Sequence, residues 1–139
     1  MLNDLAPYLN FNGDGAAALA LYQAALGGEV TEKMTYRDLP HEVAPEVADY
    51  ILHSRLQVGG KSLYLCDTSP DRPVQQGDAN WVMMDFASVD DIERVFAALA
   101  EGGEVTMPLA DTFWEARYGQ LTDRFGVRWM LNCQLNTNG

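Results

Sequence analysis

Hydrophobic residues recur along two stretches of the chain at the three- and four-residue spacing of one helix face. They are Leu19, Tyr22 and Leu26 in the first stretch, and Ile92, Val95, Phe96 and Leu99 in the second. Each stretch stops at a glycine pair, which is typical of a helix C-terminus because glycine readily adopts left-handed backbone angles. Asp14 precedes the first stretch and Ser88 the second, and both residue types favour a helix N-cap. The pattern predicts two amphipathic helices, over residues 16–26 and between residues 88 and 102.

Shorter apolar or alternating segments around these helices are typical of β-strands. The predicted strands cover residues 5–11, 29–36, 49–58, 61–67, 80–86, 104–107, 113–122 and 127–135. Gly59-Gly60 is a common two-residue hairpin turn, and Asp123–Gly126 is expected to turn the chain between the last two strands. Two prolines indicate a loop over residues 37–48, with room for one helical turn. A further loop is predicted over residues 108–111.

This order of elements occurs twice. Residues 22–31 and 95–106 are nearly the same sequence, and their glycine pairs lie about half the chain apart. A repeat of that length is too long for a solenoid unit, so the 139 residues are expected to form one α+β domain of two βαβββ modules. Module 1 covers about residues 4–67 and module 2 about residues 80–135, with a linker over residues 68–79. Paired modules that close on each other are expected to make a cleft, and clefts bind ligands.

Charge and composition argue against several classes of function. Twenty acidic residues against nine basic ones give a net charge of −11, whereas nucleic-acid binders neutralise phosphates with clustered Lys and Arg. No apolar run approaches the roughly 18 residues of a membrane span, and no signal peptide pattern is present. We therefore expect a cytoplasmic protein with neither nucleic acid nor a membrane as partner. Cys66 and Cys133 are expected to be reduced and buried, and no Cys-x-x-Cys spacing suggests zinc.

No motif of a common enzyme class is present. The serines have no neighbouring histidine and acid and no nucleophile elbow, so nothing supports a hydrolase. No glycine-rich loop matches a dinucleotide-binding or phosphate-binding pattern. Asp90 and Asp91 are adjacent carboxylates, but their place at a predicted helix N-terminus explains them through the helix dipole.

Four segments carry a family resemblance. They are Pro7–Gly13, Leu63–Asp67, Asp111–Gly119 and Leu121–Trp129. With the repeated module, they resemble the PhnB-like branch of the vicinal oxygen chelate superfamily, which includes glyoxalase I, the bleomycin-resistance proteins and the extradiol dioxygenases. The resemblance implies two half-barrels facing each other around a pocket, each with its helix outside, in a homodimer. Glu115 stands where such sequences usually have glycine, and it adds a carboxylate near the expected cleft. Arg124 stands where proline is usual.

The resemblance also bears on metal binding. Metal-using members take ligands from His, Glu or Gln on the first and last strands of the two modules, and such side chains suit a divalent ion. The matching positions here are Pro7 or Tyr8 with Asn10, then Tyr64 or Cys66, then Trp81 to Met84, and finally Met130. None of these is a usual ligand set. We therefore expect no metal and no cofactor, which speaks against glyoxalase and dioxygenase chemistry.

The residues expected to bind a ligand are apolar or aromatic walls and two polar anchors. The walls are Tyr8, Tyr64, Trp114 and Met130, and the anchors are His53 and Arg117. Arginine suits an anionic group and tryptophan a stacking wall. Plainer interpretations stay open. His53 fits an ordinary polar or hydrogen-bonded residue of a strand. Arg117 fits an ion pair with Glu115 or across strands, and Trp114 fits the core or a dimer interface.

Three functions remain open on sequence alone. The favoured one is a cytoplasmic, homodimeric protein that binds a small molecule. The second is a lyase or isomerase with a non-standard metal or a metal-free acid–base pair, for which the candidate catalytic residues are His53 and Glu115. The third is an interaction module with no ligand. The PhnB-like branch carries an inherited 3-demethylubiquinone-9 3-methyltransferase label, but the predicted elements supply no doubly wound cofactor site.

Overall fold

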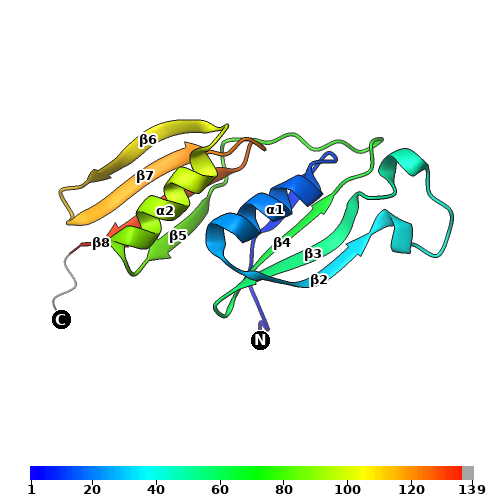
Figure 1. Cartoon of the computed structure of the whole chain (residues 1–139), viewed down its shortest axis with the longest axis horizontal. Coiled ribbons are helices and arrows are strands. Elements are labelled where there is room, and N and C mark those ends of the chain that lie inside the picture. Colours follow the sequence, from blue (N-terminus) through cyan, green and yellow to red (C-terminus); the bar gives the residue numbers. More distant parts are fainter. Residues whose placement is uncertain (136–139) are drawn as a thin grey trace. The chain divides into compact units, whose positions relative to one another are not determined.

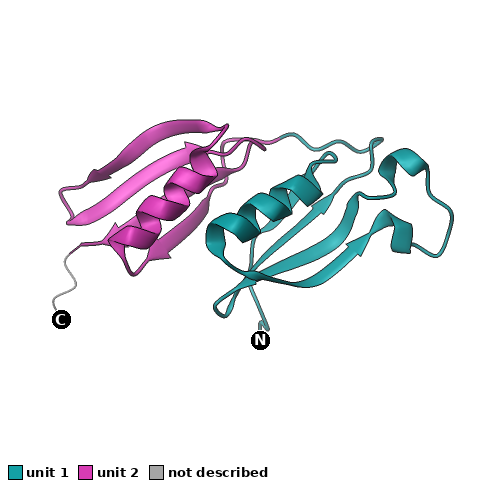
Figure 2. Cartoon of the chain, in the orientation of Figure 1, with its two compact units in different colours: residues 1–75 teal, residues 76–139 magenta. Residues whose placement is uncertain are grey.

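The computed structural model describes residues 1–135, which form two compact units. Unit 1 comprises residues 1–75, and unit 2 begins at residue 76 (Figure 2). The boundary falls inside the predicted linker. Each unit is a four-stranded mixed sheet with one helix, in the order βαβββ. The predicted α+β class and the repeated module are therefore confirmed.

Unit 1 pairs its strands in the order β1-β4-β3-β2, with β1 and β4 parallel and the other neighbours antiparallel (Figure 1). Its elements are β1 (Tyr8–Phe11), α1 (Gly15–Leu26), β2 (Glu29–Thr35), β3 (Ile51–Val58) and β4 (Lys61–Asp67). Two short 3₁₀ turns, Tyr36–Asp38 and Pro45–Val47, occupy the predicted loop between β2 and β3.

Unit 2 repeats the arrangement as β5-β8-β7-β6, with β5 and β8 parallel. Its elements are β5 (Val82–Phe86), α2 (Val89–Ala100), β6 (Glu104–Asp111), β7 (Ala116–Thr122) and β8 (Arg128–Gln134). Each helix has 12 residues, and within residues 1–135 no helix is long and apolar enough to cross a membrane.

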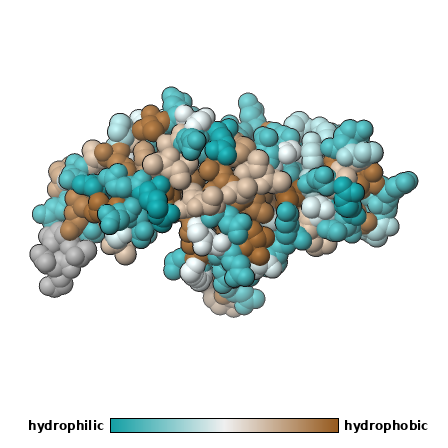
Figure 3. Space-filling model, in the orientation of Figure 1, coloured by the Kyte–Doolittle hydropathy of each residue, from teal (hydrophilic) through white to brown (hydrophobic). Residues whose placement is uncertain are grey.

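Each helix packs on one face of its own sheet and leaves the other face open. In unit 1, α1 contacts β3 and β4, and in unit 2, α2 contacts all four strands. The largest fully buried side chains of the two cores are Phe11, Tyr22, Ile51, Leu56 and Leu65 in unit 1, and Ile92, Leu99, Leu121, Trp129 and Leu131 in unit 2. Figure 3 shows hydrophilic side chains over α2 and more apolar ones over α1, whose outer positions are mainly alanine.

The two glycines of each pair have different structural roles. The first glycine of each pair, Gly27 or Gly102, has a positive φ of 72° or 75°, which ends the helix in the left-handed region. The second lies against a strand. A Cβ on Gly28 would stand 2.6 Å from the carbonyl oxygen of Gln57, and one on Gly103 would stand 2.3 Å from that of Thr122. Both positions therefore exclude a side chain, and the motif is kept in both units for the same physical reasons.

The two helices are capped by different residues. Ser88 caps α2 as predicted, because its Oγ accepts a hydrogen bond from the Asp91 amide at 3.1 Å. Asp14 occupies the N-cap position of α1 as predicted, but its side chain makes no cap hydrogen bond. Asp67, at the end of β4, accepts from the amides of Gly13 and Gly15 instead, each at 2.8 Å.

The strand registers explain this difference. Asp67 pairs with Phe11 in unit 1, and Cys133 pairs with Phe86 at the equivalent place in unit 2. Because a thiol is a poor acceptor for backbone amides, α2 needs a cap from its own sequence, whereas α1 does not. The N-termini of the two helices are thus stabilised by residues that do not correspond in the repeat.

Three strand predictions need correction. Residues 108–111 belong to β6 and not to a loop, because bulges after Val105 and Met107 accommodate Pro108 in this edge strand. Residues 113–115 form a turn before β7, in which Glu115 has a φ of 61°. The first strand begins at Tyr8 rather than at residue 5.

Candidate functional site

The open face of unit 1 is the sheet face opposite α1. Along β4, Ser62, Tyr64 and Cys66 are partly exposed and alternate with buried residues that face the helix. Two β-bulges set what the other strands contribute. An extra residue in β2 pairs Val30 with Leu56 but Glu32 with Arg55. The bulge therefore moves Glu32 to the open face, since a one-residue slip exchanges the two faces of a strand.

The second bulge changes which sheet face the residues at the start of β3 point to. There the register changes from Met34–His53 to Thr35–Ile51, which leaves one extra residue in β3. Ile51 is buried toward the helix, and His53 is partly exposed on the open face. His53 and Arg55 are therefore neighbours on the same side of β3.

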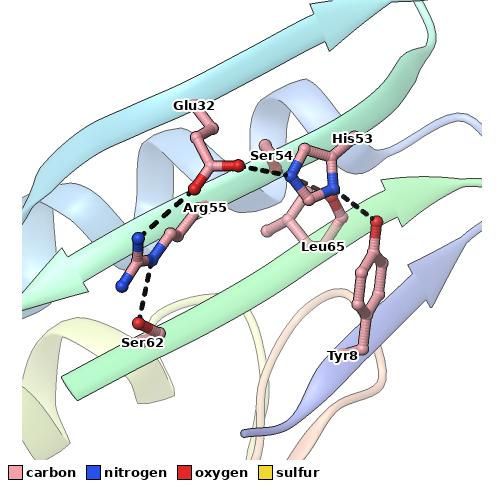
Figure 4. Close-up of polar contacts among 7 residues, drawn as sticks. All are labelled: Tyr8, Glu32, His53, Ser54, Arg55, Ser62 and Leu65. Carbon is pink, nitrogen blue, oxygen red and sulfur yellow. Dashed lines mark hydrogen bonds and ion pairs between the residues drawn. The ribbon is translucent and has the colours of Figure 1, made fainter. Parts of the chain in front are cut away.

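A continuous polar network crosses the open face from β1 to β2 (Figure 4). Tyr8 Oη lies 2.9 Å from Nδ1 of His53, and Nε2 of His53 lies 3.0 Å from Oε1 of Glu32. The other carboxylate oxygen of Glu32 accepts from Nη1 of Arg55 at 3.3 Å. Arg55 also donates from Nε to Ser62 Oγ at 2.9 Å. The network links four strands and fixes the planes of the imidazole and the guanidinium.

Aromatic rings form the floor beside this network. Tyr8 and Tyr64 stack with ring centroids 5.5 Å apart and an interplanar angle of 10°. The imidazole of His53 lies 6.0 Å from the Tyr8 ring and 5.8 Å from the Tyr64 ring. The guanidinium of Arg55 lies over the Tyr64 ring at 5.8 Å, within the range of a cation–π contact. Stacked phenols with polar edges offer a flat surface to a planar ligand.

The electrostatics keep Glu32 charged and Tyr8 neutral. Hydrogen bonds from His53 and then from Arg55 lower the pKa of Glu32 despite some desolvation. Burial, and after it the neighbouring Cys66 and Glu32, raises the pKa of Tyr8. Burial likewise raises the pKa of the Cys66 thiol. At neutral pH the face therefore carries a carboxylate, a guanidinium and an uncharged phenol.

The raised pKa of Tyr8 predicts its alkaline titration. Tyrosinate absorbance is measured during alkaline titrations of the wild type and of Tyr8→Phe, and the difference between the two curves reports the ionisation of Tyr8. We expect this ionisation to occur above the ordinary pKa of about 10. Because the folded chain then holds this proton longer than the unfolded chain, Tyr8 should reduce stability as the pH rises through that range. Ionisation at or below the ordinary value would contradict the described surroundings of Tyr8.

Three of the six predicted ligand-binding residues therefore meet on one face: Tyr8, His53 and Tyr64. The other three, Trp114, Arg117 and Met130, belong to unit 2.

Arg117 is engaged in ion pairs, donating from Nε to Asp111 at 2.9 Å and from Nη1 to Glu93 of α2 at 3.0 Å. Met130 lies in register with Met83, on the side of β8 opposite its buried residues. Trp114 is 48% exposed in the turn before β7, 6.1 Å from the ring of Tyr118.

Sequence reasoning missed Glu32, the carboxylate partner of His53. It proposed Glu115 instead, which belongs to the turn before β7 in unit 2. Alternation along a single strand does not show where a bulge occurs. The sequence therefore could not show that Glu32 lies on the same sheet face as Arg55. Within residues 1–135, no three His, Cys, Asp or Glu side chains are grouped so that they could hold a metal ion.

The chain was compared with known families and proteins. A model of the Glyoxalase/Bleomycin resistance protein/Dioxygenase superfamily matches residues 5–131. Protein YjdN of Escherichia coli (strain K12) is 31% identical over an alignment of 140 positions, which covers 92% of this chain and 93% of YjdN.

Two solved structures extend the comparison. The crystal structure of protein PA1353 from Pseudomonas aeruginosa has a TM-score of 0.87 and 41% identity, covering 96% of this chain and 98% of that one. A PhnB protein from Bacillus cereus has a TM-score of 0.76 and 21% identity, covering 94% and 99%. At that identity the PhnB likeness concerns the fold. The superfamily model and the coverage of YjdN confirm the predicted resemblance at the level of the superfamily.

Proposed function

We propose, because the chain belongs to the Glyoxalase/Bleomycin resistance protein/Dioxygenase superfamily, that it binds a small molecule and holds it on the open face of unit 1. The observation that carries the proposal is the Tyr8–His53–Glu32–Arg55 network beside two stacked phenols. Polar groups held in fixed positions next to a flat apolar surface are the usual components of a small-molecule site.

The network still has hydrogen-bonding capacity to offer a ligand. Arg55 uses Nε and Nη1 within the chain, while its Nη2 makes no hydrogen bond to residues 1–135. The hydroxyl of Tyr64 likewise has no hydrogen-bond partner in that part of the chain. The side chains of His53 and Arg55 are 31% and 29% exposed, so a ligand can reach them. The ligand we propose is planar, stacks on Tyr8 or Tyr64 and reaches Arg55 with an oxygen.

The residues at the superfamily's metal positions do not favour a divalent cation. On β1 and β4, Asn10 lies opposite Cys66 and accepts a hydrogen bond from its thiol at 3.2 Å. The raised pKa of Cys66 keeps that thiol protonated, which makes it a poor ligand. At β5 and β8, the matching positions are Trp81 to Met84 and Met130, and Met130 lies in register with Met83. An amide, a protonated thiol and thioethers are not a donor set typical of magnesium, manganese or zinc.

The remaining expectations belong to the same proposal. We propose a cytoplasmic homodimer, in keeping with the family resemblance, with no nucleic acid or membrane as partner. Unit 2 would have to contribute to ligand binding for Trp114, Arg117 and Met130 to contact the ligand. The ion pairs of Arg117 with Asp111 and Glu93 favour its plainer interpretation as a structural residue.

A fragment screen with matched variants tests the proposed function. Small planar aromatic compounds are tested by saturation-transfer NMR against the wild type, Tyr64→Ala and Tyr118→Ala. Compounds that bind are expected to lose about tenfold in affinity in Tyr64→Ala, because stacking on this ring is removed. Tyr118, a partly exposed tyrosine on a strand of unit 2, is the control and should change little. Equal losses in both variants, or no binding compound at all, would contradict the proposal.

An acid–base enzyme is the second candidate, and the contact between His53 and Glu32 favours it. A carboxylate that orients an imidazole is a common arrangement for moving a proton. A lyase or isomerase of this kind should turn over 2-oxoaldehyde hemithioacetals or catechols, with or without added nickel, manganese or zinc, and should lose that activity in His53→Gln. Flat progress curves for the wild type under every condition would exclude it for these substrates.

A further inference from the structure

We propose that Glu32 is a positioning residue that sets the direction of the Tyr8–His53 hydrogen bond, so that Tyr8 offers the ligand an acceptor. The site would then select planar molecules that carry an N–H or O–H donor. This inference rests on the proposed function, since it names the chemistry of the ligand held by the same face. Its basis is the chain of contacts from Arg55 through Glu32 and His53 to Tyr8.

The first step concerns the hydrogen between Glu32 and His53. Hydrogen bonds from His53 and Arg55 keep Glu32 ionised, and an ionised carboxylate can only accept. Nε2 of His53, 3.0 Å from Oε1 of Glu32, must therefore be the nitrogen that carries a hydrogen. In its neutral form the imidazole has one N–H, so Nδ1 then has a lone pair.

The second step concerns Tyr8. With a lone pair on Nδ1 at 2.9 Å, the hydroxyl of Tyr8 must donate to His53. Cys66 is the competing acceptor, because its thiol also interacts with the Tyr8 hydroxyl. Sulfur accepts hydrogen bonds weakly, and the thiol donates to Oδ1 of Asn10. The imidazole nitrogen is therefore the stronger partner for the Tyr8 hydrogen.

The third step follows for a ligand on the open face. Tyr8 is 45% exposed, and a hydroxyl that donates to Nδ1 of His53 directs its hydrogen into the network. The oxygen can then present only lone pairs to an approaching molecule. A ligand N–H or O–H would be satisfied there, whereas a ligand acceptor would meet an acceptor. One such hydrogen bond is worth about 3- to 10-fold in affinity.

The hydrogen positions are tested by long-range proton–nitrogen NMR of the imidazoles at about pH 8. We expect wild-type His53 to carry its hydrogen on Nε2. In Glu32→Gln the amide oxygen must face the Arg55 donor, which turns the amide NH₂ toward Nε2 of His53. The tautomer should therefore invert, with the hydrogen on Nδ1. Glu29→Gln, on the same strand, is the matched control and should leave His53 unchanged. A hydrogen on Nδ1 in the wild type, or an unchanged tautomer in Glu32→Gln, would overturn the proposal.

Ligand selection is tested with two probes of the same shape, indole-2-carboxylate and benzofuran-2-carboxylate, which both carry a carboxylate for Arg55 but of which only the indole has an N–H donor. In the wild type, indole-2-carboxylate is expected to bind about 3- to 10-fold more tightly. Tyr8→Phe should remove this preference, and Glu32→Gln should remove or reverse it. Equal binding of both probes on unit 1 would overturn this inference but leave the proposed function standing. Failure of both probes to bind would contradict the proposed function together with the inference.

Discussion

Asp67→Asn is expected to destabilise unit 1 by about 2–4 kcal/mol, the first of the two largest effects that the structure predicts. Oδ1 of Asp67 accepts from the amides of Gly13 and Gly15, and Oδ2 accepts from the amide of Ile51, all at 2.8 Å. The side chain is buried, with 4% of the residue exposed. An asparagine offers one oxygen and turns an NH₂ group toward at least one of these donors, which leaves a buried amide unsatisfied.

The geometry leaves little room for relaxation. A Cβ on Gly15 would stand 2.6 Å from Oδ2 of Asp67, so the carboxylate fills the space that a side chain would need. Denaturant unfolding followed by circular dichroism measures the loss. The reference variant is Ser88→Ala, which removes a single cap hydrogen bond of α2. Its free energy of unfolding should fall by about 1 kcal/mol. The explanation fails if Asp67→Asn loses no more than that reference.

Asp123→Asn should produce a loss of similar size in unit 2, about 2–4 kcal/mol. Oδ1 of Asp123 accepts from the amides of Phe125 and Val127 at 2.8 and 3.1 Å, which holds the turn between β7 and β8. Oδ2 accepts from the indole of Trp129 at 2.8 Å. Trp129 is 1% exposed, so loss of this bond leaves a buried donor beside the new amide.

Tryptophan fluorescence during denaturant unfolding is the measurement for Asp123→Asn. The control is Asp85→Asn, which changes an exposed carboxylate on a strand of the same unit and should stay within about 0.5 kcal/mol. A loss from Asp123→Asn that matches the control would mean that the turn is held by its backbone alone.

The helices and turns could be predicted because their signals are local. The spacing of Ile92, Val95 and Leu99 marks the buried face of α2, and all three are at most 2% exposed. Gly59 and Gly60 make the predicted hairpin turn, each with a positive φ. The side-chain acceptor at the start of α1 could not be predicted, because Asp67 lies more than fifty residues away in sequence and reaches Gly15 only through the parallel pairing of β1 with β4.

Part of the candidate site could also be predicted from the sequence. Tyr8 and Tyr64 correspond across the β1–β4 pair, and His53 lies on the adjoining strand. Tyr8 and Tyr64 were selected because the family resemblance places them at cleft positions, and His53 was selected by its residue type. Glu32 was missed because a bulge decides which face it joins, and a bulge is a property of the paired strands rather than of one strand's pattern.

Binding of a small molecule on the open face of unit 1 is tested most directly by backbone amide NMR spectra recorded during a titration with indole-2-carboxylate, a planar molecule whose carboxylate can reach Arg55. The shifts are expected to concentrate in β1, β3 and β4, around Tyr8, His53 and Tyr64, and to disappear in Tyr64→Ala. Shifts confined to unit 2 or to the helix-covered faces, or shifts that persist unchanged in that variant, would contradict the claim.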